Sequence, residues 1–220
     1  LSMYPDPETR EREIKNISAV YSDLATTILP QLRRSRLIAN IEIIGKSDEE
    51  IMEFWRNDPK ELSPEELLYA STLTDSDADK EKIYQYATVN FPQDYRGWNN
   101  MATAYYLNGD YASAKQALDR AATVSPNAPE VNVNKALFAL MEGDTQNAKE
   151  LLGKGSGANN LESVMGLLNI MEGDYNQAAD AFRGTQSNNA ALADILTNNY
   201  NGAESTLKSI KNPDAMTYYL

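Results

Sequence analysis

Apolar residues between positions 61 and 212 recur every three or four residues, in short runs separated by glycines and polar stretches. This interval predicts amphipathic helices, because residues three and four apart share one face of a helix. Three of the runs end at a glycine and continue directly into a second apolar run, at Gly109, Gly143 and Gly173. The pattern therefore predicts a series of helical hairpins, each bent at a glycine.

The segments around these glycines align with one another as internal repeats. The interval from Gly143 to Gly173 is slightly shorter than the interval from Gly109 to Gly143. Five positions after each glycine comes an alanine, and four positions later a large apolar residue: Ala114 and Leu118, Ala148 and Leu152, Ala178 and Phe182. A weaker fourth copy follows, with Ala203 in the alanine position.

Each residue of this motif has a physical reason for its place. A glycine ends a helix at low cost because it adopts left-handed backbone geometry without a Cβ clash. The aspartate that follows is expected to cap the next helix. The alanine suits a close approach of two helices. One hairpin cannot bury its own apolar face, so neighbouring hairpins must stack.

The segment 95–128 resembles the tetratricopeptide repeat (TPR) family in nearly all of its signature positions: Trp98, Ala102, Tyr105, Gly109, Tyr111, Ala114, Leu118, Ala121 and Pro126. An upstream unit opens with Ser63, Pro64 and Glu66, which predict a capped helix start. The resemblance implies an all-α fold, a right-handed superhelical solenoid of TPR hairpins over 61–220. The units are expected at 61–94, 95–128, 129–158, 159–187 and 188–212, with a partial one at 213–220, and the natural chain is expected to extend beyond Leu220.

Residues 1–60 lack the repeat and predict a helix–strand–helix extension. Asp6 and Pro7 open a helix that runs toward Ile28, and the isoleucine-rich segment 36–44 is predicted to be a β-strand. Ser47 begins a capping box that opens a linking helix within 47–60. A lone strand needs a hydrogen-bonding partner. Either that partner lies upstream of Leu1, or the strand pairs with a second copy of the chain in a homodimer.

Residues 1–46 resemble the closing helix and strand of OmpA-like domains, and the order of the two regions is similar to that of Bacteroidetes envelope proteins in which TPR units follow this domain. The residues concerned are the segments 4–13 and 29–37 and the strand after them. The resemblance implies a periplasmic, outer-membrane-associated protein of the cell envelope. The family's peptidoglycan-binding motif falls earlier in the domain, so no residue of this chain is assigned to it.

Composition narrows the possible chemistry. The chain has no cysteine and no histidine, and its net charge is −12. The absence of cysteine and histidine excludes thiol nucleophiles, a Ser-His-Asp triad and the commonest metal ligand. The negative net charge opposes binding to nucleic acid.

No apolar run is long enough for a membrane span. Asp75, Asp77 and Asp79 alternate as in a calcium loop but lack its glycine and distal glutamate. We expect no enzyme activity, no cofactor, no metal and no direct membrane insertion.

The functional surface expected for such an array is the inner face of the first helices, at positions 2, 5, 9, 12 and 13 of each unit. The candidates for binding a protein or peptide in this groove are Arg96, Asn99, Thr103, Tyr106, Val133, Leu137, Met141, Ser163 and Leu167. Other residues in the same positions are Leu107, Glu130, Leu140, Asn160, Ile170 and Met171. The structural repeat positions are Trp98, Ala102, Gly109, Ala114, Pro126, Gly143, Ala148, Gly173 and Ala178.

The sequence favours a non-enzymatic protein–protein interaction scaffold and leaves two alternatives open. The first is homo-oligomeric assembly through the ends of the array or the strand 36–44. The second is a glycan-binding surface built from exposed tyrosine and asparagine side chains. An apolar groove that contains methionine suits an extended segment or an amphipathic helix.

Overall fold

The structure is a computed structural model of the whole chain, and it describes residues 6–16, 22, 24–28 and 45–220. It divides into two compact units, residues 1–45 and 46–220.

The first unit contains helix α1, Pro7–Asn16, and a single turn of π-helix, η1, Leu24–Ile28. The predicted cap is present, because the Asp6 carboxylate accepts hydrogen bonds from the Thr9 backbone N–H at 2.8 Å and the Thr9 hydroxyl at 2.6 Å. The predicted strand at 36–44, and with it the predicted homodimer contact, lies outside the described residues.

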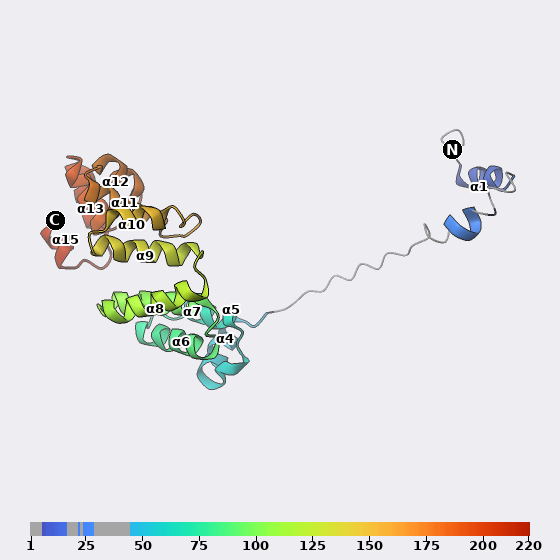
Figure 1. Cartoon of the computed structure of the whole chain (residues 1–220), viewed down its shortest axis with the longest axis horizontal. Helices are drawn as coiled ribbons and strands as arrows, with labels where there is room; N and C mark the ends of the chain where they lie inside the picture. The colour runs from blue at the N-terminus through green and yellow to red at the C-terminus, as the bar shows by residue number, and fades with distance from the viewer. Residues whose placement is uncertain (1–5, 17–21, 23, 29–44) are drawn as a thin grey trace. The chain divides into compact units, whose positions relative to one another are not determined.

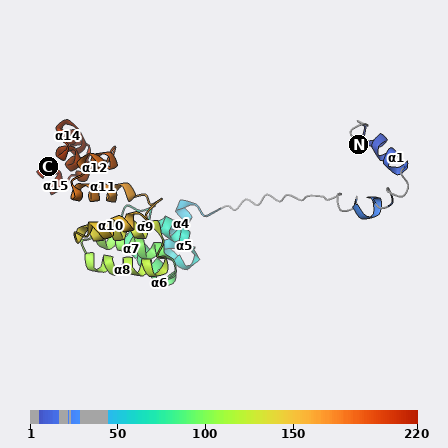
Figure 2. The same cartoon turned by 45° about the horizontal axis from the view of Figure 1, so that its top comes forward.

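The second unit is a stack of helical hairpins, and its described residues contain no strand. It begins with α4, Asp48–Asn57, and the short 3-10 helix η2, Pro59–Glu61. The hairpins follow in chain order (Figures 1 and 2), and a last short helix closes the chain. Their helices are α5 Pro64–Ala70 with α6 Asp77–Asn90, α7 Tyr95–Leu107 with α8 Tyr111–Val124, α9 Pro129–Met141 with α10 Thr145–Leu152, α11 Leu161–Glu172 with α12 Tyr175–Ala181, α13 Asn188–Leu196 with α14 Tyr200–Ser209, and α15 Ala215–Tyr219.

Most helix starts carry the caps that the sequence predicts. Ser47 and Ser63 each form a complete capping box, with Glu50 and Glu66 respectively. The carboxylates of Asp110 and Asp144 accept backbone hydrogen bonds at the starts of α8 and α10. The equivalent prediction for Asp174 is wrong, because its side chain accepts no hydrogen bond from α12. Asp174 therefore stabilises the start of α12 only through its negative charge, which interacts favourably with the positive end of the helix dipole.

The three repeat glycines have the left-handed geometry that the sequence predicts. Their φ angles are +77° at Gly109, +81° at Gly143 and +85° at Gly173. In the fourth copy the same bend falls on Asn198, whose φ is +61°. Asparagine tolerates this region better than most residues do, because its short side chain bonds locally. The hairpin of α13 and α14 therefore keeps the bend without a glycine.

Gly143→Val is expected to destabilise the chain by about 1 kcal/mol or more, because a β-branched residue resists left-handed geometry. A Cβ at this position would meet no atom within 4 Å, so backbone strain is the whole cost. Gly143→Asn is the matched control and should cost less, since Asn198 occupies the same bend between α13 and α14. Urea unfolding followed by circular dichroism measures both; equal midpoints for the two variants would contradict the assignment.

Alanines at the predicted positions let the two helices of each hairpin pack closely. Ala114, Ala148 and Ala178 are fully buried. The large residues four positions later are almost fully buried: Leu118, Leu152 and Phe182. Tyr111, another position of the repeat signature, is half exposed because it lies at the start of α8, beside Tyr106. Each hairpin thus contributes small residues at the helix contact and one large residue behind it.

Helix α4 packs into the core of the second unit. Ile51 of α4 is buried in a cluster with Leu62, Leu67 and Ile83. The Trp55 ring stands edge-on to Tyr86 of α6, with ring centroids 5.9 Å apart. The capped helix after Ser47 therefore covers the first hairpin of the stack.

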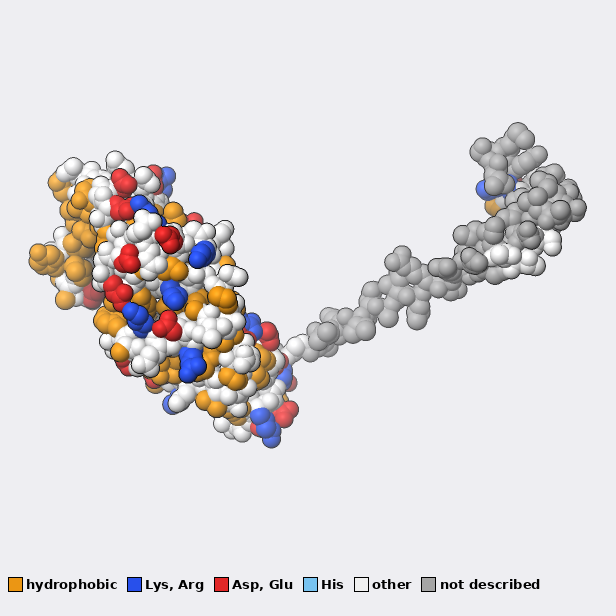
Figure 3. Space-filling view, viewed as in Figure 1, with side chains coloured by type: hydrophobic (Ala, Val, Ile, Leu, Met, Phe, Trp, Pro, Cys, Tyr) orange, Lys and Arg blue, Asp and Glu red, His pale blue; other side chains and the backbone are white. Residues whose placement is uncertain are grey.

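Charged side chains of both signs are scattered over the face of the second unit seen in Figure 3, with apolar side chains between them. Two ion pairs repeat across successive hairpins: Lys115–Glu142 at 2.5 Å and Lys149–Glu172 at 2.6 Å. All four groups are partly exposed, so each pair adds little stability. Among the described helices, none has the length and apolar character needed to cross a bilayer.

Candidate functional site

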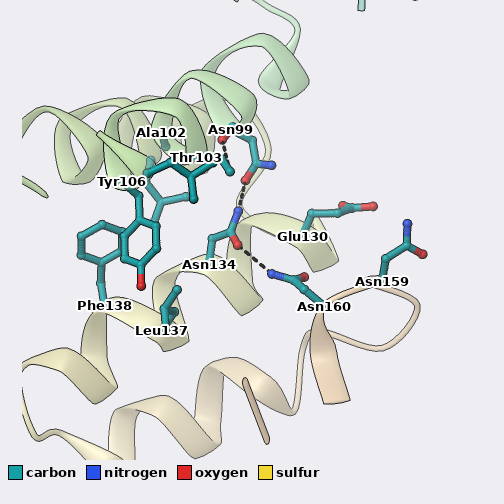
Figure 4. Close-up of a pocket in the computed structure, with 12 residues that line it drawn as sticks. Asn99, Ala102, Thr103, Tyr106, Glu130, Asn134, Leu137, Phe138, Asn159 and Asn160 are labelled. Atoms are coloured by element: carbon teal, nitrogen blue, oxygen red, sulfur yellow. Dashed lines mark hydrogen bonds between the residues drawn. The ribbon is translucent and has the colours of Figure 1, made fainter. Parts of the chain in front are cut away.

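A cavity of about 320 Å³ lies between α7 and α9, at the loop that leads into α11. Its size falls at the lower end of the range for ligand pockets. The apolar part of its lining is Ala102, Tyr106, Leu107, Leu118, Leu137 and Phe138. The polar part is Asn99, Thr103, Glu130, Asn134, Asn159 and Asn160 (Figure 4). We call this space the α7–α9 cavity.

Three asparagines form a hydrogen-bonded row along the polar side of the α7–α9 cavity. The Asn134 side-chain amide donates to the Asn99 Oδ1 at 2.9 Å, and the Asn160 amide donates to the Asn134 Oδ1 at 2.9 Å (Figure 4). Each side-chain amide has two N–H donors, and the row uses only one of those of Asn134 and Asn160. The row is therefore held in place and still has hydrogen-bonding capacity for a ligand.

Aromatic rings form the opposite, apolar side. The Tyr106 ring stands edge-on to Phe138, with centroids 6.0 Å apart, and lies 5.6 Å from the Tyr111 ring. Edge-to-face contacts of this kind hold rings in a defined orientation. An apolar group entering the cavity would thus meet a preformed wall, with the asparagine row across from it (Figure 4).

A second cavity, of about 450 Å³, lies on a neighbouring face of α7 and is its repeat equivalent. Asn100, Thr103 and Ala104 of α7 line it, and in the previous unit they hold the repeat positions that Asn134, Leu137 and Phe138 hold in α9. The rest of the lining is Leu68, Ser71, Thr72, Asp77, Lys80, Tyr84, Leu107 and Asn108. We call it the α5–α7 cavity. Thr103 and Leu107 line both cavities, so the two adjoin at α7, and we refer to the pair as the groove.

The structure brings four of the predicted groove residues together in the α7–α9 cavity: Asn99, Thr103, Tyr106 and Leu137. Met141, at 47% exposure, and the exposed Ser163 line neither cavity, and Leu167 packs partly buried between two core clusters. Glu130 and Asn160, which share the predicted positions, also line the α7–α9 cavity.

The placement of Val133 in the groove is wrong, because Val133 has no exposed surface and belongs to the core around Ala148. The residue that faces Asn99 is the next one, Asn134. The reason is geometric: a helix between two neighbouring helices contacts the preceding one (backward) and the following one (forward) with different residues. Position 5 of α7 faces forward to α9, and position 6 of α9 faces back to α7. Sequence reasoning missed Asn134 and Phe138 for this reason, and it missed Asn159 because this residue lies in the turn before α11.

Arg96 does not line either cavity, because neighbouring carboxylates hold it. Its guanidinium donates to Asp94 at 2.5 Å and to Glu65 of α5 at 2.8 Å. The two carboxylates raise the pKa of Arg96, and the guanidinium in turn lowers the pKa of Asp94. Arg96 thus joins two hairpins, and its contacts do not point to a ligand.

Glu130, which lines the cavity, is held by Tyr95 of α7. The Tyr95 hydroxyl donates to the Glu130 Oε2 at 3.2 Å. Burial and the nearby Glu130 carboxylate raise the pKa of Tyr95, so it remains a donor. Among the described residues, no cluster of three or more carboxylates could hold a metal ion, and this includes the segment with Asp75, Asp77 and Asp79.

The profile of the tetratricopeptide repeat family matches residues 95–128, which are α7, α8 and their flanking turns. Residues 95–128 form a tetratricopeptide repeat. No catalytic family matches the chain. Comparison with curated protein sequences gives no match.

Two solved structures share the TPR fold of the chain at low sequence identity. One comes from the crystal structure of the APC/C hetero-tetramer Cut9-Hcn1, with a TM-score of 0.53 and 16% identity over 72% of this chain. This chain spans only 34% of the length of that protein. The other is a tetratricopeptide repeat protein from Parabacteroides merdae, with a TM-score of 0.51 and 14% identity, over 96% of this chain and 83% of the other. At these identities the likeness concerns the fold alone.

Proposed function

We propose that the chain is a non-enzymatic scaffold that binds a peptide segment of a partner protein in the groove formed by the two cavities across α7. The observation that carries this proposal is the asparagine row of the α7–α9 cavity, which faces an apolar wall. A peptide presents the same combination, since its backbone offers N–H and C=O groups and its side chains are often apolar. TPR domains are in general protein-interaction scaffolds, and the Cut9-Hcn1 structure is a TPR protein in a complex with another protein.

The groove proposal is tested by selecting peptides from a displayed library of random dodecapeptides on the immobilised full chain. Thr103→Phe should abolish binding of the enriched peptides, because Thr103 is exposed and lines both cavities. Thr123→Phe is the matched control: Thr123 is also exposed and also donates to the carbonyl four residues earlier, but it lies on α8 away from both cavities. Failure to enrich any peptide, or equal loss in both variants, would refute the groove.

A place in the cell envelope is the second part of the proposal. It is supported by the resemblance of residues 1–46 to the end of an OmpA-like domain. Fractionation of cells that express the complete reading frame tests it. Recovery in the outer-membrane and periplasmic fractions is expected, and recovery with the cytoplasmic marker would exclude this location while leaving the groove proposal intact.

A further inference from the structure

Among the described residues, Glu130 is the one charged residue that lines the α7–α9 cavity. It is partly buried at the start of α9, and the Tyr95 hydroxyl donates to one of its two carboxylate oxygens. No lysine or arginine in the part of the chain that the structure describes forms an ion pair with it. The nearby Arg96 already pairs with Asp94 and Glu65. Glu130 thus offers a carboxylate oxygen to whatever enters the groove.

A ligand that covers Glu130 must replace the water around its carboxylate. A buried carboxylate without a partner is costly, whereas a charged hydrogen-bond donor compensates for the lost water. The α5–α7 cavity does not favour an acidic ligand, because its one lysine among the described residues, Lys80, already pairs with Asp77 at 3.6 Å. The chain as a whole carries a net charge of −12, which attracts a cationic partner at longer range.

The two cavities also set the spacing of a ligand's apolar groups. They lie on neighbouring faces of α7 that share Thr103 and Leu107, and a helix with its side chains is about 10 Å across. An extended peptide rises about 3.3 Å per residue, so about three residues bridge that distance. The lining of both cavities includes apolar side chains, among them Leu137 and Phe138 in one and Leu68 in the other.

Building on the proposed groove function, we propose that the occupant is a basic, extended protein segment. One of its apolar side chains fills the α7–α9 cavity next to a lysine or arginine that pairs with Glu130. A second apolar side chain, about three residues away, enters the α5–α7 cavity. The asparagine row holds the backbone between them. Glu130 is then the residue that selects for charge, and the cavities select for apolar spacing.

The peptides enriched in the library selection provide the first test. We expect a shared lysine or arginine next to an apolar residue, with a second apolar residue about three positions from the first. The enriched peptides could fail to bind the Thr103→Phe variant and yet share no basic residue. That result would overturn this inference and leave the groove itself established. If no peptide is enriched, the groove proposal fails first, so the two failures are distinguishable.

The second test measures the affinity of one enriched peptide, labelled with fluorescein, for variants of the full chain. Glu130→Gln keeps the shape and removes the charge, and it should weaken binding about tenfold, the usual scale of one charged hydrogen bond. Glu162→Gln is the matched control, because Glu162 is the second residue of α11 as Glu130 is of α9, but it lies outside both cavities.

A charge exchange separates recognition from damage to the fold. Glu130→Lys should lose the basic peptide and gain the peptide whose basic residue is replaced by glutamate. Rising NaCl concentration should weaken binding to the wild-type chain more than to Glu130→Gln, since salt screens the charge pair. Equal affinities of Glu130→Gln and the wild-type chain for the basic peptide would overturn the inference.

Discussion

Gly166→Ala is expected to lower the free energy of unfolding by about 1–3 kcal/mol, the usual cost of overpacking a core. The direction is opposite to the ordinary effect of this change, since alanine normally stabilises a helix interior by up to about 1 kcal/mol over glycine. Gly166 lies in the middle of α11, and a Cβ there would stand 2.6 Å from two atoms of the Phe182 ring. Phe182 is buried and cannot move aside freely.

The internal repeats explain why a glycine stands at this place. Gly166 and Phe182 hold the same two repeat positions as Ala102 and Leu118, and as Ala136 and Leu152. The α7–α8 and α9–α10 hairpins pair an alanine with a leucine. The α11–α12 hairpin pairs the smaller glycine with the larger phenylalanine. The summed volume of the pair is thus kept, which is the form of core substitution that proteins tolerate best.

Restoring the pair seen in the other hairpins tests this explanation. Gly166→Ala with Phe182→Leu should be more stable than Gly166→Ala alone, and a double-mutant cycle should give a coupling energy of about 1 kcal/mol or more. Urea unfolding followed by circular dichroism provides the four free energies. A Gly166→Ala chain as stable as the wild type, or effects of the two changes that simply add, would show that the two residues are not in contact.

The hairpins could be predicted from the sequence because their signals are local. Gly109, Gly143 and Gly173 mark left-handed bends, and Ser47 and Ser63 mark helix starts through bonds between residues close in sequence. The bend at Asn198 could not be predicted, since asparagine is common elsewhere in the chain and does not by itself mark a bend. Local sequence signals thus predict most of the helices, but they do not predict a bend at which another residue, here Asn198, takes the place of glycine.

The groove could be predicted only in part, because it depends on how neighbouring helices face each other. Asn99, Thr103, Tyr106 and Leu137 follow from the repeat frame, and all four line the α7–α9 cavity. The frame places Val133 there too, but Val133 is buried in the core and the next residue, Asn134, faces back to Asn99 of α7. The recurrence of asparagine at positions 99, 134 and 160 is a signal in the sequence, although its unequal spacing hides it from a fixed frame.

Ala148→Leu is expected to destabilise the chain by about 1–3 kcal/mol. Ala148 has no exposed surface and lies at the contact between α9 and α10, in a cluster with Val133, Ala136 and Leu152. A leucine side chain is larger than that of alanine by an isopropyl group, and Ala148 is fully buried among its neighbours, so this group has no free space to enter. The two helices must then separate or the neighbouring side chains must leave their preferred rotamers, and both are costly.

The adjacent position provides the control, since Asn147→Leu introduces the same side chain on the exposed face of α10. The Asn147 side chain forms no hydrogen bond with any described residue, and its backbone N–H, which bonds to Asp144, is unchanged by the substitution. Asn147→Leu should therefore stay within about 0.5 kcal/mol of the wild type, as surface changes usually do. If Ala148→Leu unfolds at the same urea concentration as Asn147→Leu, then α9 and α10 do not approach closely at this alanine. The equivalent alanines, Ala114 and Ala178, would then need another explanation, because all three are buried in the same position of their hairpins.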